Sequence, residues 1–208
     1  MHTFHRVFEF ASDDERQLVA HFGNKLNFTS ISNSQRIDGV NFIDTVYNGV
    51  DTSVYTPIGT HTKREYLFWA GRMIEKKGPE DAIHVAKKLH MKLIMAGEIT
   101  EAAYFEQTIK PHIDGEQIKL VEHSNRDDLI SMYQGAKVTL VPTKWNEPFG
   151  LVPVESMACG TPAVSYDQGG VSETIADGTG FLVKDAEGIE GLVHRVKQII
   201  DLSPDWVS

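Results

Sequence analysis

Short apolar segments rich in β-branched and aromatic residues alternate with segments of helical periodicity along this sequence of 208 residues. Most of the apolar segments are four to seven residues long and are bounded by Gly, Pro, Asn or Asp, as buried strands usually are. Because these segments are apolar throughout rather than on alternate residues, they are typical of parallel strands buried on both faces. The sequence therefore predicts an α/β fold, a parallel sheet with helices on both faces.

The expected elements can be placed by residue number. The expected strands are the segments 26–31, 42–46, 66–70, 92–96, 118–121, 138–141, 163–166 and 181–183. The expected helices are the segments 79–89, 101–113, 126–133, 151–158 and 187–200. Pro79 suits the first turn of its helix, because a proline there sacrifices no hydrogen bond.

A turn-rich stretch without periodicity, from Tyr47 to Gly59, interrupts the alternation. We expect a boundary at its start, so that residues 1–47 form one part of the chain and residues 48–208 the other. The residues before the boundary read as helix, strand, helix and strand, which is too little chain for an independent hydrophobic core. This first part must therefore pack against the longer part or against a partner.

The charge balance excludes several classes of protein. Lys and Arg number 20 against 29 Asp and Glu, which gives a net charge of −9. Proteins that bind nucleic acid or anionic membranes through a general basic surface need the opposite balance, so we expect no nucleic-acid partner. No apolar run reaches the length of a membrane span, and the N-terminal residues lack the apolar core of a signal peptide. With Cys159 as the single cysteine, we expect a protein of the reducing cytoplasm.

The loop after the segment 66–70 carries the first candidate site. Gly71 ends the expected strand, and Arg72 and Lys77 follow before the next helix. In an open parallel sheet, ligands bind at the carboxyl ends of the strands. An arginine fork and a lysine point charge suit a diphosphate, although a solvated charged turn is an equally good interpretation from spacing alone. For the neighbouring Lys76 we favour the solvated turn.

The loop after the segment 138–141 carries the second candidate site. Gly150 permits a close approach of the backbone at the start of the helix 151–158, where free amides can bind an anion. Glu147 and Glu155 flank that start, and a carboxylate can accept hydrogen bonds from two sugar hydroxyls. Such a pair also arises by chance on an exposed helix. Trp145 suits stacking on a sugar or base, or packing within the loop.

The third candidate loop contains Gly169 and Gly170, which suit either a close approach to a ligand or a tight turn. Two common nucleotide-binding fingerprints, GxxxxGK[ST] and GxGxxG, are absent from the sequence. The nine histidines are scattered, without a cluster at metal-ligand spacing, so we expect no metal site.

In this order, the loops resemble the C-terminal half of family 4 glycosyltransferases (glycosyl transferases group 1), which have the GT-B fold. The resemblance runs from about residue 48 to about residue 200. It is carried by the strings NGVD (48–51), GRMIEKKG (71–78), AG (96–97), DDLISMYQGAKVTLVPT (127–143), EPFGLVPVESMACGTPAV (147–164), GGVSETI (169–175) and GTGFLV (178–183). The block with two glutamates, together with the GR…KG loop upstream, is highly specific for this family.

The resemblance implies a Rossmann-like domain that binds a nucleotide-sugar donor. Arg72 and Lys77 match the basic pair that holds the donor diphosphate, next to Gly71. Glu155 matches the glutamate that holds the ribose hydroxyls, and Glu147 the one beside the transferred sugar. The amides of Phe149, Gly150 and Leu151 match the contact with the distal phosphate. The residues that match the contacts with the base are Val121, through its backbone, and Leu129 or Tyr133, through their side chains.

The resemblance also implies the chemistry. These enzymes transfer a sugar from a donor such as a UDP-, GDP- or ADP-sugar, with retention of the anomeric configuration and without a metal. Catalytic roles fall to Arg72 and Lys77, which stabilise the departing diphosphate, and to Glu147, which orients or stabilises charge. Glu122 and His123 replace the glycine that many relatives carry after the strand 118–121, so the contact with the base differs here.

The family has two Rossmann-like domains, and the sequence contains one. We expect residues 48–208 to be the C-terminal donor-binding domain. Residues 1–47 are then a remnant of the N-terminal acceptor domain with the linker. The chain alone should not transfer sugar, and a membrane contact would arise only through the absent parts. Two alternatives remain open: a module that binds a nucleotide or nucleotide sugar without transferase activity, and a nucleotide-sugar epimerase of the same fold.

Overall fold

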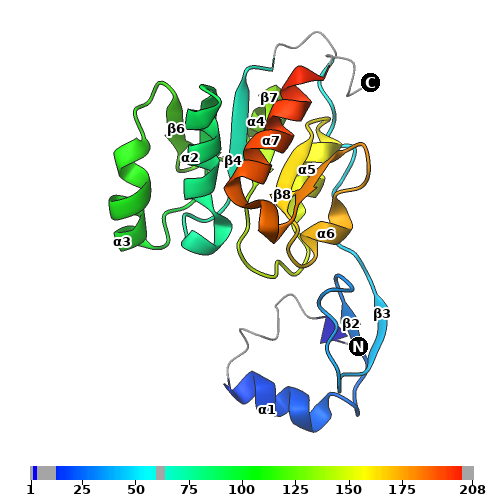
Figure 1. Cartoon of the computed structure of the whole chain (residues 1–208). Helices are drawn as coiled ribbons and strands as arrows, with labels where there is room; N and C mark the ends of the chain where they lie inside the picture. Colours follow the sequence, from blue (N-terminus) through cyan, green and yellow to red (C-terminus); the bar gives the residue numbers. More distant parts are fainter. Residues whose placement is uncertain (1, 4–12, 60–63, 203–208) are drawn as a thin grey trace.

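The structure, a computed structural model, describes residues 2–3, 13–59 and 64–202. These residues form a larger and a smaller parallel sheet (Figure 1). The larger sheet has six strands, all parallel, in the order β6-β5-β4-β7-β8-β9. Its strands are β4 (Tyr66–Ala70), β5 (Lys92–Ala96), β6 (Ile118–Val121), β7 (Ala136–Val141), β8 (Ala163–Tyr166) and β9 (Gly180–Val183).

The strand order reverses between β4 and β7. β4 pairs with β5 on one side and with β7 on the other. The chain thus builds the sheet outward through β5 and β6, and then returns to the centre to build β7, β8 and β9. The loops that leave β4 and β7 run in opposite directions and open a crevice between them, which is the usual ligand position in such sheets.

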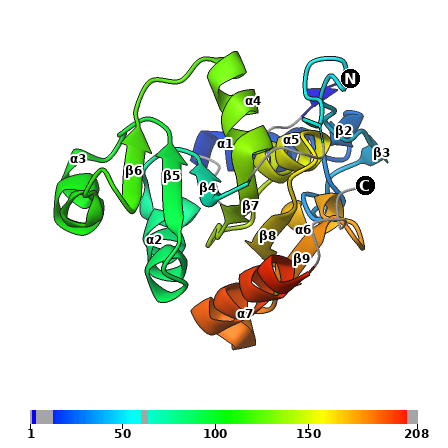
Figure 2. The same ribbon diagram turned by 90° about the horizontal axis from the view of Figure 1, so that it is seen from above.

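Helices cover both faces of the larger sheet (Figure 2). The described helices of this part are α2 (Pro79–Lys88), α3 (Ala102–Tyr104), α4 (Arg126–Gly135), α5 (Leu151–Ala158), α6 (Val171–Thr174) and α7 (Gly188–Asp201). Leu67 and Trp69 of β4 join one core cluster, with buried residues of α2 and α7. Phe68, between them, joins the opposite cluster with Ile130 and Tyr133 of α4. The predicted α/β fold with helices on both faces is therefore confirmed.

Most predicted elements agree closely with the structure, and the helix expected over 101–113 is the main exception. That segment passes from α3 into a π turn (Phe105–Ile109) and a 3₁₀ turn (Lys110–His112). Pro111 explains the break, because its ring nitrogen cannot donate to the carbonyl four residues earlier and its ring crowds that carbonyl. β7 begins two residues before its predicted start, because Ala136 pairs with Tyr66 of β4.

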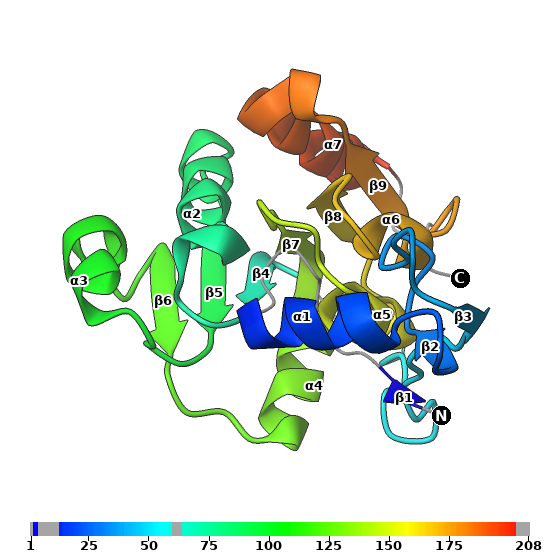
Figure 3. The ribbon, with the colours of Figure 1, turned by 90° about the horizontal axis from the view of Figure 1, so that it is seen from below.

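The smaller sheet belongs to the N-terminal part of the chain. Its order is β1 (His2–Thr3), β2 (Phe28–Ser30) and β3 (Phe42–Thr45), all parallel, and it is accompanied by α1 (Asp13–Phe22). Seen from below in Figure 3, α1 runs beneath the larger sheet. We call these residues, up to Thr45, the N-terminal module.

The helix expected between β2 and β3 does not form. Residues 31–41 are bends and turns, in which Gln35 accepts the backbone N–H of Ile31 at 2.9 Å. Asn33 and Ser34 donate their backbone N–H groups to the Glu173 side chain of α6, at 2.8 and 2.7 Å. Such side-chain contacts compete with a helical ladder, and here the tertiary contacts prevail over local propensity.

Candidate functional site

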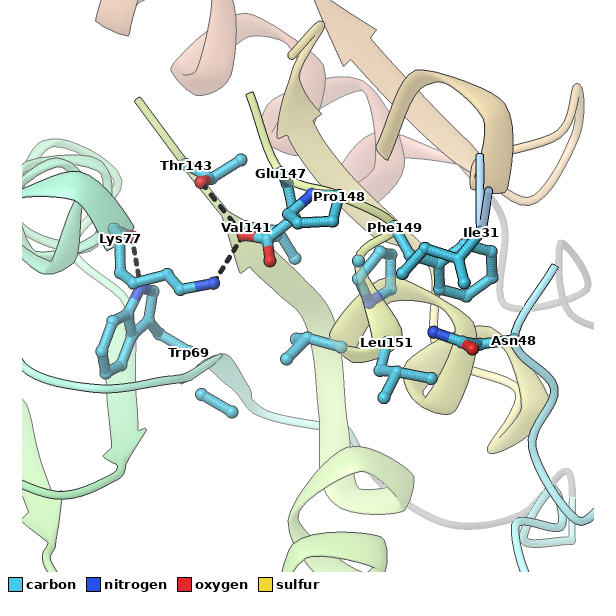
Figure 4. A pocket seen from close by; sticks show the side chains of 14 residues that line it. Ile31, Asn48, Trp69, Lys77, Val141, Thr143, Glu147, Pro148, Phe149 and Leu151 are labelled. Atoms are coloured by element: carbon cyan, nitrogen blue, oxygen red, sulfur yellow. Dashed lines mark hydrogen bonds and ion pairs between the residues drawn. The ribbon is translucent and has the colours of Figure 1, made fainter. Parts of the chain in front are cut away.

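Two adjoining cavities lie where β4 and β7 end. The first cavity, of about 300 Å³, is lined by Lys77, Glu147 and Gly150 among others (Figure 4). The second cavity, of about 670 Å³, is lined by Arg72 and Glu155 among others. Ala70 of β4 and Val152 of α5 line both cavities, so the two are neighbours along this edge of the sheet, and we call them together the hollow. The hollow coincides with the crevice expected from the strand order.

The loop after β4 presents its two cations to different cavities. Arg72 is exposed at the second cavity, and its guanidinium has no hydrogen-bond or ion-pair partner among the described residues. Lys77 ends a 3₁₀ turn (Glu75–Lys77) and lines the first cavity. The indole N–H of Trp69 donates to the backbone carbonyl of Lys77 at 3.2 Å, which fixes this turn against β4.

Glu147 is held through one of its carboxylate oxygens, Oε2. Lys77 Nζ lies 2.5 Å from Glu147 Oε2, and Figure 4 shows the ammonium pointing at that oxygen. The Trp145 indole N–H donates to the same oxygen at 2.9 Å. The single proton of the Thr143 hydroxyl faces two acceptors, the carbonyl of Lys76 at 3.3 Å and this oxygen at 3.5 Å. No donor among the described residues reaches Oε1 within hydrogen-bond distance. One oxygen is thus fully used by the protein, while the other keeps its acceptor capacity.

The N-terminus of α5 adds backbone donors to the first cavity. Gly150 precedes the helix with φ +92°, and a Cβ there would lie 2.7 Å from Val171 Cγ2, so both conformation and space require glycine. Leu151 and Val152, the first residues of α5, line the first cavity. Amides in a first helical turn have no acceptor within their own helix, and the helix dipole favours an anion beside them.

The third loop supports Glu147 through backbone contacts. The N–H of Gly170 donates to the carbonyl of Glu147 at 2.6 Å. A Cβ on Gly169 would lie 2.6 Å from the backbone nitrogen of Glu147, and one on Gly170 would lie 2.5 Å from the carbonyl oxygen of Pro148. The glycine pair therefore allows close packing of one loop on another, and neither glycine lines the two cavities.

Glu155 lies in the second cavity with one phenol on each carboxylate oxygen. Tyr133 donates to Oε2 at 2.8 Å, and Tyr55 donates to Oε1 at 3.2 Å. Burial raises the pKa of Glu155, although the hydrogen bonds from the two phenols act in the opposite direction. Burial and the nearby carboxylate also raise the pKa of both tyrosines, so they remain donors at neutral pH.

The N-terminal part of the chain also reaches the first cavity. Ile31, directly after β2, and Asn48, after β3, belong to its lining. Tyr47, directly before Asn48, packs on the Phe149 ring with centroids 6.1 Å apart. The first cavity is therefore composite, with one wall from each part of the chain.

The family follows from comparison with known proteins. Residues 56–205, well over half of the chain, match the family described as glycosyl transferases group 1. The chain belongs to this family. It contains the family domain and is shorter than its relatives.

Two curated relatives illustrate the range of the family. The D-inositol 3-phosphate glycosyltransferase of Mycolicibacterium smegmatis is 28% identical over 181 residues, which cover 80% of this chain and 42% of that protein. The glycogen synthase of Mycobacterium tuberculosis is 28% identical over 171 residues, which cover 78% of this chain and 41% of that protein. The chain thus spans about two fifths of the length of these relatives.

Solved structures of GT-B glycosyltransferases share the fold. Anabaena HepE in complex with UDP-glucose superposes with a TM-score of 0.80 at 20% identity. The superposition covers 96% of this chain and 62% of the HepE chain. Sucrose-phosphate synthase from Thermosynechococcus elongatus has a TM-score of 0.80 at 23% identity, with 99% and 59% covered. The expected membership of a group 1 glycosyltransferase family with a GT-B fold is confirmed.

The sequence-based site residues gather around the hollow, with one exception. Lys77, Glu147, Phe149, Gly150 and Leu151 line the first cavity. Gly71, Arg72, Leu129, Tyr133 and Glu155 line the second. Val121 lies outside both linings, and its carbonyl accepts the N–H of Gly97 at 3.1 Å. The next residues, Glu122 to Asn125, line the second cavity instead.

Sequence reasoning missed two contacts that shape the site. Tyr55 reaches Glu155 across 100 positions of sequence, and no local pattern indicates this. The sequence left two interpretations for Trp145, stacking on a ligand or packing within its loop. In the structure the Trp145 indole N–H donates to Glu147, and Lys77 Nζ lies 5.4 Å from the centroid of the Trp145 ring. The shared edge of the loops after β4 and β7 is the signal that could have placed Trp145 near Lys77.

The described ranges contain neither a metal-binding cluster nor a membrane-spanning helix. Among residues 2–3, 13–59 and 64–202, no group of three or more His, Cys, Asp or Glu side chains is arranged to hold a metal ion. Within the same ranges, each helix is too short or too polar to cross a membrane.

Proposed function

We propose that this chain is the donor-binding part of a retaining glycosyltransferase and that its hollow binds a nucleotide sugar. One observation carries the proposal: two cations, the free amides of α5 and two carboxylates line two adjoining cavities at the point where the strand order reverses. A diphosphate needs the positive groups, and a ribose and a hexose need the carboxylates. The membership of the glycosyltransferase family supports the assignment.

In this proposal the diphosphate lies between Arg72, Lys77 and the N-terminus of α5. When the bond to the sugar breaks, negative charge builds up on the departing diphosphate. Positive groups already in place stabilise that charge without reorganisation, and so lower the barrier. The catalytic role of Arg72 and Lys77 is therefore to stabilise the leaving group, in a reaction for which we propose no metal.

The two carboxylates take different parts of the donor. Glu155, in the second cavity, accepts the hydroxyls of the ribose. Glu147, in the first cavity, faces the transferred sugar with Oε1, since Oε2 already accepts from Lys77 and Trp145. We propose that the acceptor attacks from the face that the diphosphate leaves, through an oxocarbenium-like state, which retains the configuration. The negative charge of Glu147 then stabilises the positive sugar ring.

The donor class rests on the relatives. HepE is solved with UDP-glucose, and the proposal carries a UDP-, GDP- or ADP-sugar over to this chain. Leu129 lines the second cavity, where we propose that the base binds, with the backbone of Glu122, directly after Val121, as its second contact. A cytoplasmic location stays a prediction from the sequence.

The proposal assigns residues 48–208 to the donor-binding domain and residues 1–47 to the acceptor side. Ile31, which lines the first cavity from the N-terminal module, supports this division. With only this module on the acceptor side, we expect the chain to bind a donor and to transfer no sugar. A nucleotide-binding module without any transferase partner would give the same binding result, so transfer must be tested with the acceptor side completed.

Isothermal titration calorimetry with UDP, GDP and ADP tests the proposal on the chain as it is. We expect at least one of them to bind. Arg72→Ala and Lys77→Ala should each weaken it about tenfold or more, since a charge-assisted contact contributes about 1.5–3 kcal/mol. Lys76→Ala is the matched control, because it removes the same charge from the same loop at a residue outside both cavities. Absence of binding, or equal binding by all variants, would refute the proposal.

A further inference from the structure

Two tyrosines from distant parts of the chain hold the Glu155 carboxylate, one on each oxygen. Tyr133 belongs to α4 and donates to Oε2 at 2.8 Å, whereas Tyr55 lies in the segment after the N-terminal module and donates to Oε1 at 3.2 Å. The resemblance to the family offers Tyr133 as one of two side chains for a contact with the base, and it assigns no role to Tyr55. This arrangement restricts both the rotation of the carboxylate and its choice of rotamer.

Both phenols are themselves fixed by packing. The Tyr133 side chain is 1% exposed, and its ring meets that of Phe68 edge to face with centroids 5.0 Å apart. Tyr55 packs against the same apolar cluster, and its N–H donates to the carbonyl of Asp51 at 2.9 Å. The carbonyl of the next residue, Thr56, accepts the side-chain amide of Gln134 at 2.7 Å. The two donors are therefore in place before a ligand arrives.

The hydrogen-bond capacity of the carboxylate then defines its ligand. Each carboxylate oxygen can accept about two hydrogen bonds, and one phenol uses one of them. Since Glu155 lines the second cavity, each oxygen keeps capacity for one further donor there. Two adjacent oxygens with one free position each match the two adjacent hydroxyls of a vicinal diol.

We propose that Tyr55 and Tyr133 are positioning residues, which orient Glu155 so that it accepts both ribose hydroxyls of the donor at once. The inference rests on the proposed function, because it takes the ligand to be a nucleoside diphosphate. The two phenols restrict the rotamers of Glu155 before the ligand binds. Binding therefore does not carry the entropic cost of ordering this side chain. Neither tyrosine touches the reacting atoms in this arrangement.

A purely structural role makes a different prediction. If the phenols only satisfied a half-buried carboxylate, their removal would disturb the site for every ligand alike. If they orient Glu155 for a diol, their removal matters only when the diol is present. A pair of ligands that differ in the ribose hydroxyls alone therefore separates the two roles.

The experiment measures the affinity of the chain for the tightest binder among UDP, GDP and ADP, and for its 2′,3′-dideoxy counterpart. We expect Tyr55→Phe and Tyr133→Phe each to weaken the ribonucleotide about five- to tenfold and to leave the dideoxynucleotide unchanged. Tyr66→Phe is the matched control, because its hydroxyl lies beside the same apolar cluster and donates to the carbonyl of Met132 instead. Tyr55 is only half-buried, so its variant remains informative if Tyr133→Phe fails to fold.

Each outcome has a definite meaning. An equal loss for both ligands, or no loss for either, would overturn the positioning role while the proposed function stands. A wild-type chain that binds ribo- and dideoxynucleotides equally would overturn the diol assignment of Glu155, and the positioning role with it. A wild-type chain that binds neither would overturn the proposed function itself.

Discussion

The Glu173 carboxylate accepts the backbone N–H of Asn33 at 2.8 Å, although 140 positions separate the two residues in sequence. The same carboxylate accepts the backbone N–H of Ser34 at 2.7 Å and the hydroxyl of Tyr47 at 2.8 Å. A single side chain of α6 thus holds the turn after β2, which carries Ile31 to the first cavity. Figure 1 shows the N-terminal module beside α6. The composite wall of the cavity depends on this contact.

Glu173→Gln should loosen the turn after β2 and leave the larger sheet intact. Hydrogen bonds to an ionised acceptor are about twice as strong as those to a neutral one, so the variant keeps the size of the side chain and loses the stronger bonds. We expect amide hydrogen exchange at Asn33 and Ser34 to accelerate about fivefold, which corresponds to about 1 kcal/mol of local opening. Glu190→Gln, which removes an exposed ion pair with Lys88, should leave both amides unchanged.

The same contact should depend on pH. Burial acts to raise the pKa of Glu173, but the hydrogen bonds from Asn33 and Ser34 outweigh it and lower the pKa. Its contribution is therefore complete above the ordinary value of 4.5 and is lost as the pH falls through the lowered value. Exchange at the two amides, corrected for its intrinsic rate, should accelerate below pH 4.5 in the wild type only. The same acceleration in Glu173→Gln would contradict this assignment.

Gly170→Ala should destabilise the chain through steric contact alone. Gly170 has φ −68° and ψ −17°, which alanine adopts freely, so the backbone conformation adds no strain. The new Cβ would lie 2.5 Å from the carbonyl oxygen of Pro148, and the Glu147 loop must move away. We expect a loss of about 1–3 kcal/mol in the free energy of unfolding, measured by urea denaturation.

Gly59→Ala is the control for this steric effect, because a Cβ there would meet no atom within 4 Å. It should change the free energy of unfolding by less than about 0.5 kcal/mol. If Gly170→Ala is as stable as the control, the loop that carries Gly170 is not packed closely on the backbone of Pro148. If Gly170→Ala loses nucleoside diphosphate binding and Gly59→Ala keeps it, the third loop acts on the site through Glu147.

Substitutions of Lys77 and of Glu147, which form an ion pair, should change the affinity for a nucleoside diphosphate in opposite directions. Their side chains are 22% and 16% exposed, so water screens the Lys77–Glu147 pair only in part. In the unliganded chain Lys77 is engaged by Glu147, and a diphosphate must compete for it. Glu147→Gln should therefore tighten nucleoside diphosphate binding about two- to fivefold, while Lys77→Ala weakens it, as measured by calorimetry.

Glu106→Gln is the control for this pair, because it removes an exposed carboxylate paired with Lys110, four residues along the chain. It should leave the affinity unchanged. A loss of affinity in Glu147→Gln as large as that in Lys77→Ala would mean that Glu147 contacts the nucleotide itself and does not merely restrain Lys77.

Local patterns predicted the strands and the positions of the site loops well. β4, β5 and β8 begin and end where the apolar runs do, because fully buried strands bounded by turn residues leave little freedom in their limits. Arg72 and Lys77 come near Glu147 and Glu155 because the carboxyl ends of parallel strands share one edge. The partners inside the site escaped prediction. The phenol of Tyr55 reaches Glu155 only through the packing of the folded chain, and the turn after β2 is held by Glu173, a partner 140 positions away.

The ribose preference should disappear at acidic pH. Burial raises the pKa of Glu155 above the ordinary value of 4.5, so the carboxylate becomes protonated at a higher pH than an exposed glutamate. A protonated carboxyl has lost part of its acceptor capacity and no longer accepts two hydroxyls equally well. The ratio of the affinities for a ribonucleoside diphosphate and its 2′,3′-dideoxy counterpart should therefore fall towards one as the pH drops through the raised pKa of Glu155, before it reaches the ordinary value of 4.5. The ratio is the proper measure, because the titration of the phosphates is common to both ligands and cancels. The phenols of Tyr55 and Tyr133 have raised pKa values and stay protonated over this range, so they contribute no second transition.

Calorimetry at steps of half a pH unit locates the midpoint, and Glu155→Gln, which cannot titrate, should give a low ratio at every pH. A wild-type ratio that stays constant down to the ordinary value would show that the ribose hydroxyls are not bound by Glu155.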